Sequence, residues 1–138
     1  MVHYWKQVEE AAAFVRQQTA TMPAIGVLTG TGLGACVQSL GVETVLDYAD
    51  IPNFPVSTVV SHAGRLVAGN LAGLPTLVFQ GRFHLYEGYT AREVTFPIRV
   101  LQKLGVNHLV VTNAAGGLNL DFKAGDLMLI RDHINLTG

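Results

Sequence analysis

The sequence predicts a globular α/β domain, and three observations lead to this fold class. Of the 138 residues, 49% are hydrophobic and only 14% are charged, which is the composition of a folded chain with a substantial core. Short apolar runs alternate with stretches whose apolar residues recur at helical spacing. Glycine-rich turns follow two of the apolar runs, at 30–34 and at 112–117. The alternation of strands with helices favours a largely parallel sheet.

The first third of the chain reads as helix, strand, turn and helix. An amphipathic helix is predicted over 3–20, before the first proline, from apolar residues at helical spacing: Trp5, Val8, Ala12, Val15 and Thr19. The run "AIGVLT" (24–29) predicts a short buried strand, and 30–34 the turn that follows it. The stretch "LGACVQSL" predicts the start of a helix that stops at Gly41.

The rest of the chain continues this alternation. The stretch 64–81 predicts two strands joined by a turn around Gly73 and Pro75. A helix is predicted over 90–105, with a kink or break at Pro97. A buried strand from 108 then runs into the glycine-rich turn. Because no repeat, low-complexity segment or linker interrupts the chain, residues 1–138 are expected to belong to a single domain.

Charge and composition restrict the partners. Nine basic and ten acidic residues leave a net charge of -1, which excludes the basic surface that binds nucleic acid or an acidic membrane, so a small-molecule partner is expected. The single cysteine, Cys36, cannot form an internal disulfide, and the first residues contain no apolar leader. No apolar run approaches the roughly 20 residues that cross a bilayer. These features predict a cytoplasmic protein.

The first glycine-rich loop, Gly30–Gly34, is a candidate anion site. Its small residues let backbone N–H groups approach a ligand, and the hydroxyl of Thr31 adds a donor. Three interpretations are open here. The loop could bind phosphate, it could be an ordinary tight turn, or it could bind a dinucleotide. Dinucleotide binding is considered because Gly30, Gly32 and Ala35 fit the G-x-G-x-x-G/A pattern of dinucleotide-binding loops, and Asp50 lies about 20 residues further on.

The stretch "GRFHLYEGY" (81–89) is the second candidate. On an extended backbone Arg82, His84 and Tyr86 share one face. A guanidinium, an imidazole and a phenol in one row suit an oxyanion next to a sugar. The alternative is a solvated strand face with a structural histidine.

The third candidate is "TNAAGG" (112–117). Small residues there expose main-chain N–H groups to a ligand that lies against the backbone, although an ordinary turn has the same pattern.

The remaining chemistry-bearing residues are assigned more modest roles. His62, near Arg65, is either a second anion contact or an ordinary loop histidine. Three further histidines are expected to be structural or solvent-facing: His3, His108 and His133. Cys36 is expected in the core rather than as a nucleophile. No metal site is predicted, because the histidines are scattered and no known ligand spacing occurs.

Five blocks together carry a specific resemblance. They are "LTGTGLG", "SHAGRLVAG", "QGRFHLYEGY", "VTNAAGGLN" and "GDLMLIRDHINLTG". In this order and spacing they resemble the trimer-type purine nucleoside phosphorylases over the whole chain. The resemblance implies a phosphorylase/hydrolase-like three-layer α/β fold with a mixed central sheet. It also implies reversible phosphorolysis of purine nucleosides in purine salvage, a homotrimer at full length, and neither a metal nor an organic cofactor.

The resemblance also implies roles for individual residues. Phosphate binding is implied for Thr31, His62, Arg82, His84 and the main-chain N–H of Ala114. Tyr86 matches a tyrosine stacked against the ribose, and Asn113, Ala114 and Gly116 fall in the segment that lines the purine pocket. Glu87 is expected to orient a neighbouring histidine, so that the catalytic set comprises Arg82, His84 and Glu87.

The chain is shorter than members of this family, which run to roughly twice its length. It is therefore expected to be an amino-terminal portion of a single phosphorylase domain, incomplete on its carboxyl side. The purine-recognising residues, and with them the base preference, would lie beyond residue 138. Such a chain should be poorly active alone and should expose a sheet edge and an apolar face. Three alternatives stay open: a methylthioadenosine phosphorylase, an NAD-binding domain, and a non-catalytic phosphate or nucleoside-binding module.

Overall fold

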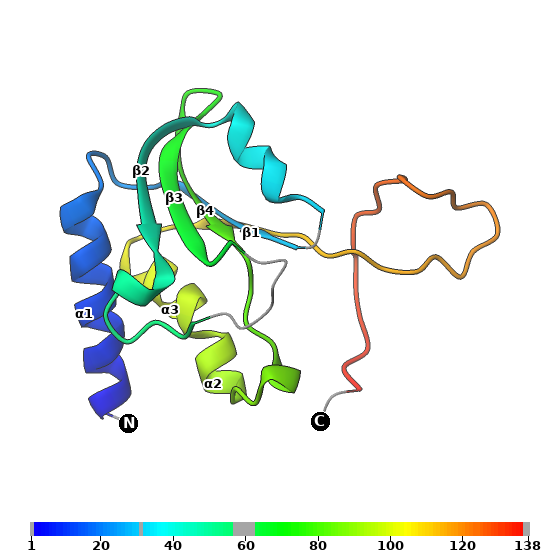
Figure 1. Ribbon diagram of the computed structural model, residues 1–138. Coiled ribbons are helices and arrows are strands. Elements are labelled where there is room, and N and C mark those ends of the chain that lie inside the picture. The colour runs from blue at the N-terminus through cyan, green and yellow to red at the C-terminus, as the bar shows by residue number, and fades with distance from the viewer. Residues whose placement is uncertain (1, 31, 57–62, 137–138) are drawn as a thin grey trace.

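The computed structural model describes residues 2–30, 32–56 and 63–136. Its centre is a five-stranded sheet in the order β2-β3-β4-β1-β5 (Figure 1). The strands are β1 (Ile25–Thr29), β2 (Gly41–Asp47), β3 (Arg65–Leu71), β4 (Leu74–Gln80) and β5 (His108–Val111). β1 pairs in parallel with β4 and β5, whereas β3 pairs antiparallel with β2 and β4. The sheet is therefore mixed, as the resemblance implied, and not largely parallel as the alternation alone suggested.

A tight hairpin turn explains the antiparallel pairing of β3 and β4. Ala72 and Gly73 join the two strands, and both have positive φ angles, of 51° and 88°. A two-residue turn with both φ angles positive matches the twist of the strands that it connects. The Gly73 N–H donates to Asn70 Oδ1 at 2.7 Å and fixes the turn. The predicted pair of strands is thus confirmed.

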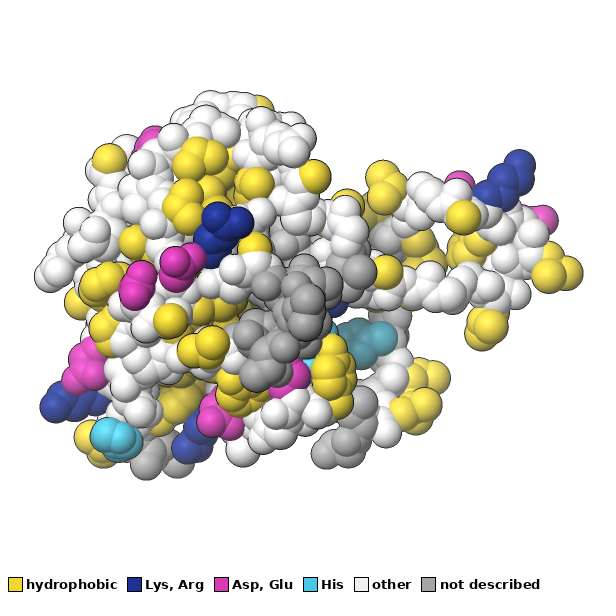
Figure 2. Space-filling model, in the orientation of Figure 1, with side chains coloured by type: hydrophobic (Ala, Val, Ile, Leu, Met, Phe, Trp, Pro, Cys, Tyr) yellow, Lys and Arg dark blue, Asp and Glu magenta, His cyan; other side chains and the backbone are white. Residues whose placement is uncertain are grey.

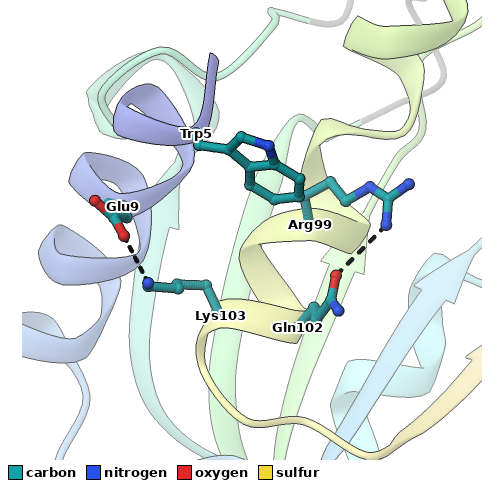
Figure 3. Close-up of a pocket in the computed structure, with 5 residues that line it drawn as sticks. All are labelled: Trp5, Glu9, Arg99, Gln102 and Lys103. Carbon is teal, nitrogen blue, oxygen red and sulfur yellow. Dashed lines mark hydrogen bonds and ion pairs between the residues drawn. The ribbon is translucent and has the colours of Figure 1, made fainter. Parts of the chain in front are cut away.

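One face of the sheet is covered by α1 (Val2–Gln18) and α3 (Phe96–Lys103). The buried residues of α1 recur at helical spacing and pack on sheet residues such as Leu66, Leu77 and Phe79. The predicted first helix is confirmed, but Trp5 is not in the core, because 45% of its surface is exposed. Its ring instead borders an open groove between α1 and α3, with the Arg99 guanidinium 6.0 Å from its centre (Figure 3).

The predicted break at Pro97 is also present. A short helix, α2 (Ala91–Val94), ends before Thr95, and α3 begins at Phe96 with the proline in its first turn. Proline is tolerated there because the N–H that it lacks would have no partner within the helix. Among the described residues, no helix is long and apolar enough to cross a membrane.

The other face of the sheet differs most from the prediction. The expected α-helix before Gly41 is a 3₁₀ helix, η1 (Gly34–Ser39), and the chain then enters β2, which the pattern did not indicate. β2 is an edge strand with exposed Val42 and Val45, so its sequence lacks a buried apolar run. Cys36 lies exposed on η1 and not in the core as expected.

The last strand is also more exposed than predicted. In β5 the exposed fractions of Leu109, Val110 and Val111 are 42%, 50% and 54%, because β5 pairs with β1 alone among the strands that the structure describes. The described segment after it, 112–136, forms neither helix nor strand and projects away from the sheet (Figure 1). Apolar side chains are exposed along this arm (Figure 2), among them Leu118, Leu120, Leu127 and Leu129. The expected open edge and apolar surface are thus present.

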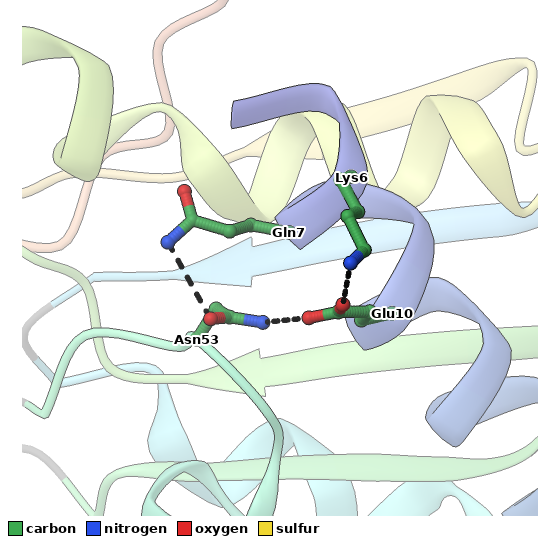
Figure 4. Close-up of polar contacts among 4 residues, drawn as sticks. All are labelled: Lys6, Gln7, Glu10 and Asn53. Atoms are coloured by element: carbon green, nitrogen blue, oxygen red, sulfur yellow. Dashed lines mark hydrogen bonds and ion pairs between the residues drawn. The ribbon is translucent and has the colours of Figure 1, made fainter. Parts of the chain in front are cut away.

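The loop after β2 is held against α1 by polar contacts (Figure 4). The loop leaves the short 3₁₀ helix η2 (Tyr48–Asp50) and contains Asn53, whose φ angle of 61° is one that asparagine tolerates. The Gln7 side chain donates to the Asn53 side chain at 3.4 Å, and Asn53 donates to Glu10 at 3.0 Å. Lys6 lies 3.9 Å from Glu10 on the exposed face of the helix. These contacts tie the loop to the exposed face of α1.

Candidate active site

Three loops meet at Gly30, which directly follows β1. Because β1 lies between β4 and β5 and is parallel to both, the carboxyl ends of the three strands share one edge of the sheet. A Cβ atom at Gly30 would lie 2.7 Å from the Thr112 carbonyl oxygen and 3.1 Å from Arg82 Nη2. It would also lie 3.1 Å from Asn113 Cα. Glycine is therefore required at this position for the loops to converge.

Arg82 is placed by the backbone that follows β4. Gly81 turns the chain with a φ angle of 118°, and the buried Tyr48 hydroxyl donates to the Gly81 carbonyl at 2.9 Å. Burial raises the pKa of Tyr48 well above its ordinary value, so this phenol stays a neutral donor. Arg82 itself is half-buried, with its Nε atom shielded from solvent. The guanidinium thus points toward Gly30 on a fixed stem.

His84 and Tyr86 lie together, although not on the extended backbone that the sequence suggested. The chain forms a 3₁₀ turn, η3 (Leu85–Glu87), and not a strand. His84 and Tyr86 therefore do not alternate along an extended backbone. The two rings nevertheless stack, with centres 4.7 Å apart and planes inclined by 12°. Glu87 Oε1 accepts the backbone N–H of His84 at 2.8 Å. The carboxylate therefore fixes the backbone that carries His84.

The third loop is brought only partly into the site. Asn113 packs next to Gly30, and its amide donates to the Ala114 carbonyl at 3.2 Å. Ala114 and Gly116 are exposed, and no described atom lies within 4 Å of a Cβ placed on Gly116. These two residues belong to the start of the projecting arm. Thr31 and His62 lie outside the described residues.

A cavity of about 660 Å³ adjoins these side chains. Arg82, His84 and Tyr86 are among its lining residues, and Tyr86 is 76% exposed. The rest of the lining is mostly apolar and comes from the sheet and from α2 and α3, including Leu28, Phe79, Pro97, Ile98, Leu109 and Val111. A cation and an imidazole beside an apolar wall can hold an anionic group next to a ring or a sugar.

The structure also places the residues behind the other interpretations. Asp50 follows the edge strand β2, and β3 and β4 separate β2 from β1. In a dinucleotide-binding unit the acid follows the strand next to the glycine loop, so this arrangement does not fit. His3 and His108 are exposed, as expected, and the backbone N–H of His133 donates to Asp132. Within the described ranges, no group of three or more metal-ligating side chains forms.

Two residues that support the site were not identified from the sequence. The Thr112 hydroxyl accepts the Gly30 N–H at 2.8 Å, and Tyr48 holds Gly81 from across the sheet. Both contacts join residues far apart in the chain, so no local motif indicates them. The only local signal was the position of Thr112 at the start of the stretch "TNAAGG".

Comparisons with known proteins identify the family of this chain. Residues 24–138 match the family described as the phosphorylase superfamily. Purine nucleoside phosphorylase 1 of Bacillus subtilis is 54% identical over 132 residues, which are 96% of this chain and 49% of the relative. The mouse purine nucleoside phosphorylase is 54% identical over 134 residues, covering 97% of this chain and 46% of the relative.

A solved structure supports the same relationship. The chain superimposes on isoform 2 of the Schistosoma mansoni purine nucleoside phosphorylase, solved with cytosine and ribose-1-phosphate, with a TM-score of 0.81 and 41% identity. The match covers 88% of this chain and 43% of that structure. The chain thus spans about half the length of the curated relatives that it matches. Sequence and fold together show that this chain belongs to the phosphorylase superfamily.

Proposed function

We propose that this chain carries the phosphate- and ribose-binding part of a purine nucleoside phosphorylase. The reaction converts a purine nucleoside and phosphate reversibly into the free base and ribose 1-phosphate. The observation that supports this most is the convergence at Gly30 of the loops after β1, β4 and β5, with Arg82 Nη2 at the meeting point. Relatives at 54% identity that are named purine nucleoside phosphorylase support the choice of substrate.

The phosphate would bind where the loops converge. Arg82 would present its guanidinium to two oxygens, His84 would donate or share a proton, and the Ala114 N–H would add a main-chain donor. Thr31 and His62 are assigned to the same phosphate by their motifs alone. The half-buried position of Arg82 strengthens its attraction for a dianion, because screening by water is reduced there.

The sugar and base would lie beyond the phosphate. Tyr86 offers an exposed ring face for the ribose at the rim of the apolar cavity. Asn113, with Ala114 and Gly116, would line the purine side. Glu87 would act through His84, since its carboxylate holds the backbone N–H of that residue.

The chemistry follows from charge development. As the bond between the sugar C1′ and the purine nitrogen breaks, its electron pair leaves with the base and positive charge builds on the ribose. A phosphate oxygen then forms the new bond to C1′. A dianion held beneath the ring by Arg82, His84 and the Ala114 N–H stabilises that positive charge and is positioned to attack. Phosphate is thus both nucleophile and electrostatic catalyst, and the proposal requires neither a metal nor an organic cofactor.

The proposal extends to assembly and location. A homotrimer is proposed for the full-length protein on the basis of family resemblance. An exposed apolar surface at β5 and along 112–136 is consistent with further protein contacts. A cytoplasmic location is proposed because Cys36 is a free, exposed thiol, which persists best in a reducing compartment.

The test is the release of hypoxanthine from inosine, with and without phosphate, accompanied by calorimetric titration of phosphate. Phosphate-dependent release supports the reaction. Phosphate binding without any release would fit the phosphate- and ribose-binding part of an enzyme, since the chain spans only about half the length of its relatives. If the chain shows neither hypoxanthine release nor phosphate binding, the proposal is refuted. The variant Arg82→Ala tests the phosphate contact of this side chain. Its matched control is Arg99→Ala, which alters an exposed arginine on α3.

A further inference from the structure

The side chain of Thr112 extends the pairing of β1 and β5 beyond the end of the sheet. Its hydroxyl accepts the Gly30 N–H at 2.8 Å and lies 3.2 Å from the Leu28 carbonyl, to which it donates. The backbone N–H of Thr112 donates to the same carbonyl at 3.0 Å. One residue therefore holds the end of β1 through both main chain and side chain, from 82 positions away in the sequence.

The Gly30 N–H needs such a partner. Gly30 is buried, and a buried amide without an acceptor is costly. Gly30 also begins the glycine loop, because its carbonyl accepts the Leu33 N–H at 3.2 Å. Fixing the Gly30 amide thus fixes the orientation of the first peptide of the loop.

The other end of the loop is held in a similar way. The Gln80 side-chain amide donates to the Gly34 carbonyl at 2.9 Å. Gln80 ends β4 and Thr112 follows β5, so the two side chains come from the strands on either side of β1. Two side chains that bond to the loop backbone restrain Gly30 and Gly34 from both flanks.

We propose that Thr112 is a positioning residue, which holds the Gly30 backbone in the orientation that binds phosphate, with Gln80 assisting at Gly34. This inference rests on the proposed function. A loop that binds an anion through main-chain groups loses affinity when it must first be ordered, so a restraint present before binding raises affinity. Thr112 acts through Gly30 and is not assigned a contact with the ligand.

The test compares inorganic phosphate binding by Thr112→Val, Thr112→Ser and the unmutated chain. Valine keeps the shape but leaves the Gly30 N–H without an acceptor, so phosphate should bind about tenfold more weakly. Serine keeps the hydroxyl and should stay within about twofold. Thr44→Val is the matched control, since the Thr44 hydroxyl, like that of Thr112, donates to a backbone carbonyl, in this case that of Gln18, but lies on β2.

The measurement separates positioning from simple stabilisation. Calorimetry is run at a temperature where every variant is folded. A lower melting temperature for Thr112→Val with an unchanged phosphate Kd would overturn the inference. If that variant does not fold, Gln80→Met provides the same comparison at the other end of the loop, and an unchanged Kd there would count against it.

A second readout uses the unmutated chain. The Gly30 amide should exchange its hydrogen slowly, and exchange at the rate of an unstructured peptide would refute the restraint. The two proposals can also fail separately. An unmutated chain that binds no phosphate refutes the phosphate site, whereas a protected Gly30 amide with normal phosphate binding by Thr112→Val refutes only the positioning role.

Discussion

Gly30→Ala should separate the three loops that form the site. The new methyl group would lie 2.7 Å from the Thr112 carbonyl oxygen, which belongs to the backbone and cannot rotate away. Unstrained contacts between heavy atoms are about 3.5 to 4.0 Å, so the loop after β5 must move by roughly 0.8 Å or more. Overpacking of this kind costs about 1 to 3 kcal/mol.

Two measurements on this variant test the reasoning. In urea unfolding, a loss of about 2 kcal/mol corresponds to a midpoint lower by about 1 M, given typical slopes for small proteins. Phosphate binding should weaken at the same time, because the methyl group also approaches Arg82 Nη2 to 3.1 Å. The displaced guanidinium would then no longer face the ligand.

Gly34→Ala is the matched control within the same loop. No described atom lies within 4 Å of a Cβ placed on Gly34, and its φ angle is not in the left-handed region. Its unfolding free energy should therefore stay within about 0.5 kcal/mol of the unmutated value. If Gly30→Ala behaves like Gly34→Ala in both assays, the loops do not converge at Gly30 and the site as described is wrong.

Three further predictions concern single side chains. Arg82→Ala should weaken phosphate binding by about tenfold or more, since a charge-assisted contact is lost, and an unchanged Kd would remove Arg82 from the site. Tyr86→Ala should raise the KM for nucleoside with little effect on phosphate, measured by saturation kinetics in both substrates, and the reverse pattern would contradict its ribose role. Tyr48→Phe should change the pH dependence of stability. Burial raises the pKa of Tyr48 in the folded state, so its stabilisation is complete below the unfolded value near pH 10. Above that pH, it is lost by about 1.4 kcal/mol per pH unit. The test is the urea midpoint of the unmutated chain and of Tyr48→Phe, measured between pH 8 and about 11. If the midpoints of the two proteins change with pH in parallel, the prediction is refuted.

Much of the local structure could be predicted because it depends on neighbours in the sequence. The apolar spacing of the first helix, the turn at Ala72 and Gly73 and the break at Pro97 are all short-range features, and the structure contains each of them. The failures also have local causes. β2 was missed because an edge strand needs no continuous apolar run, and the exposure of Trp5 was not foreseen because helical spacing does not distinguish a groove from the interior.

The candidate site was predicted as separate motifs and not as an arrangement. The blocks around Gly30, Arg82 and Asn113 are each readable in the sequence, and so is the resemblance that they carry together. The roles of the individual residues remain predictions, including those of Thr31 and His62. The stacking of His84 on Tyr86 across a 3₁₀ turn was not expected, because an extended backbone was assumed there.

The sequence by itself determined most of the elements, the family and the residue types available for binding. Only the tertiary structure decided that β1 lies between β4 and β5, which brings Gly30, Arg82 and Asn113 to one point. It also decided that Thr112 and Tyr48 would hold that point from distant parts of the chain. The physical reason is that periodicity and turn chemistry act over a few residues. Strand order and buried hydrogen bonds depend instead on which distant segments pack together.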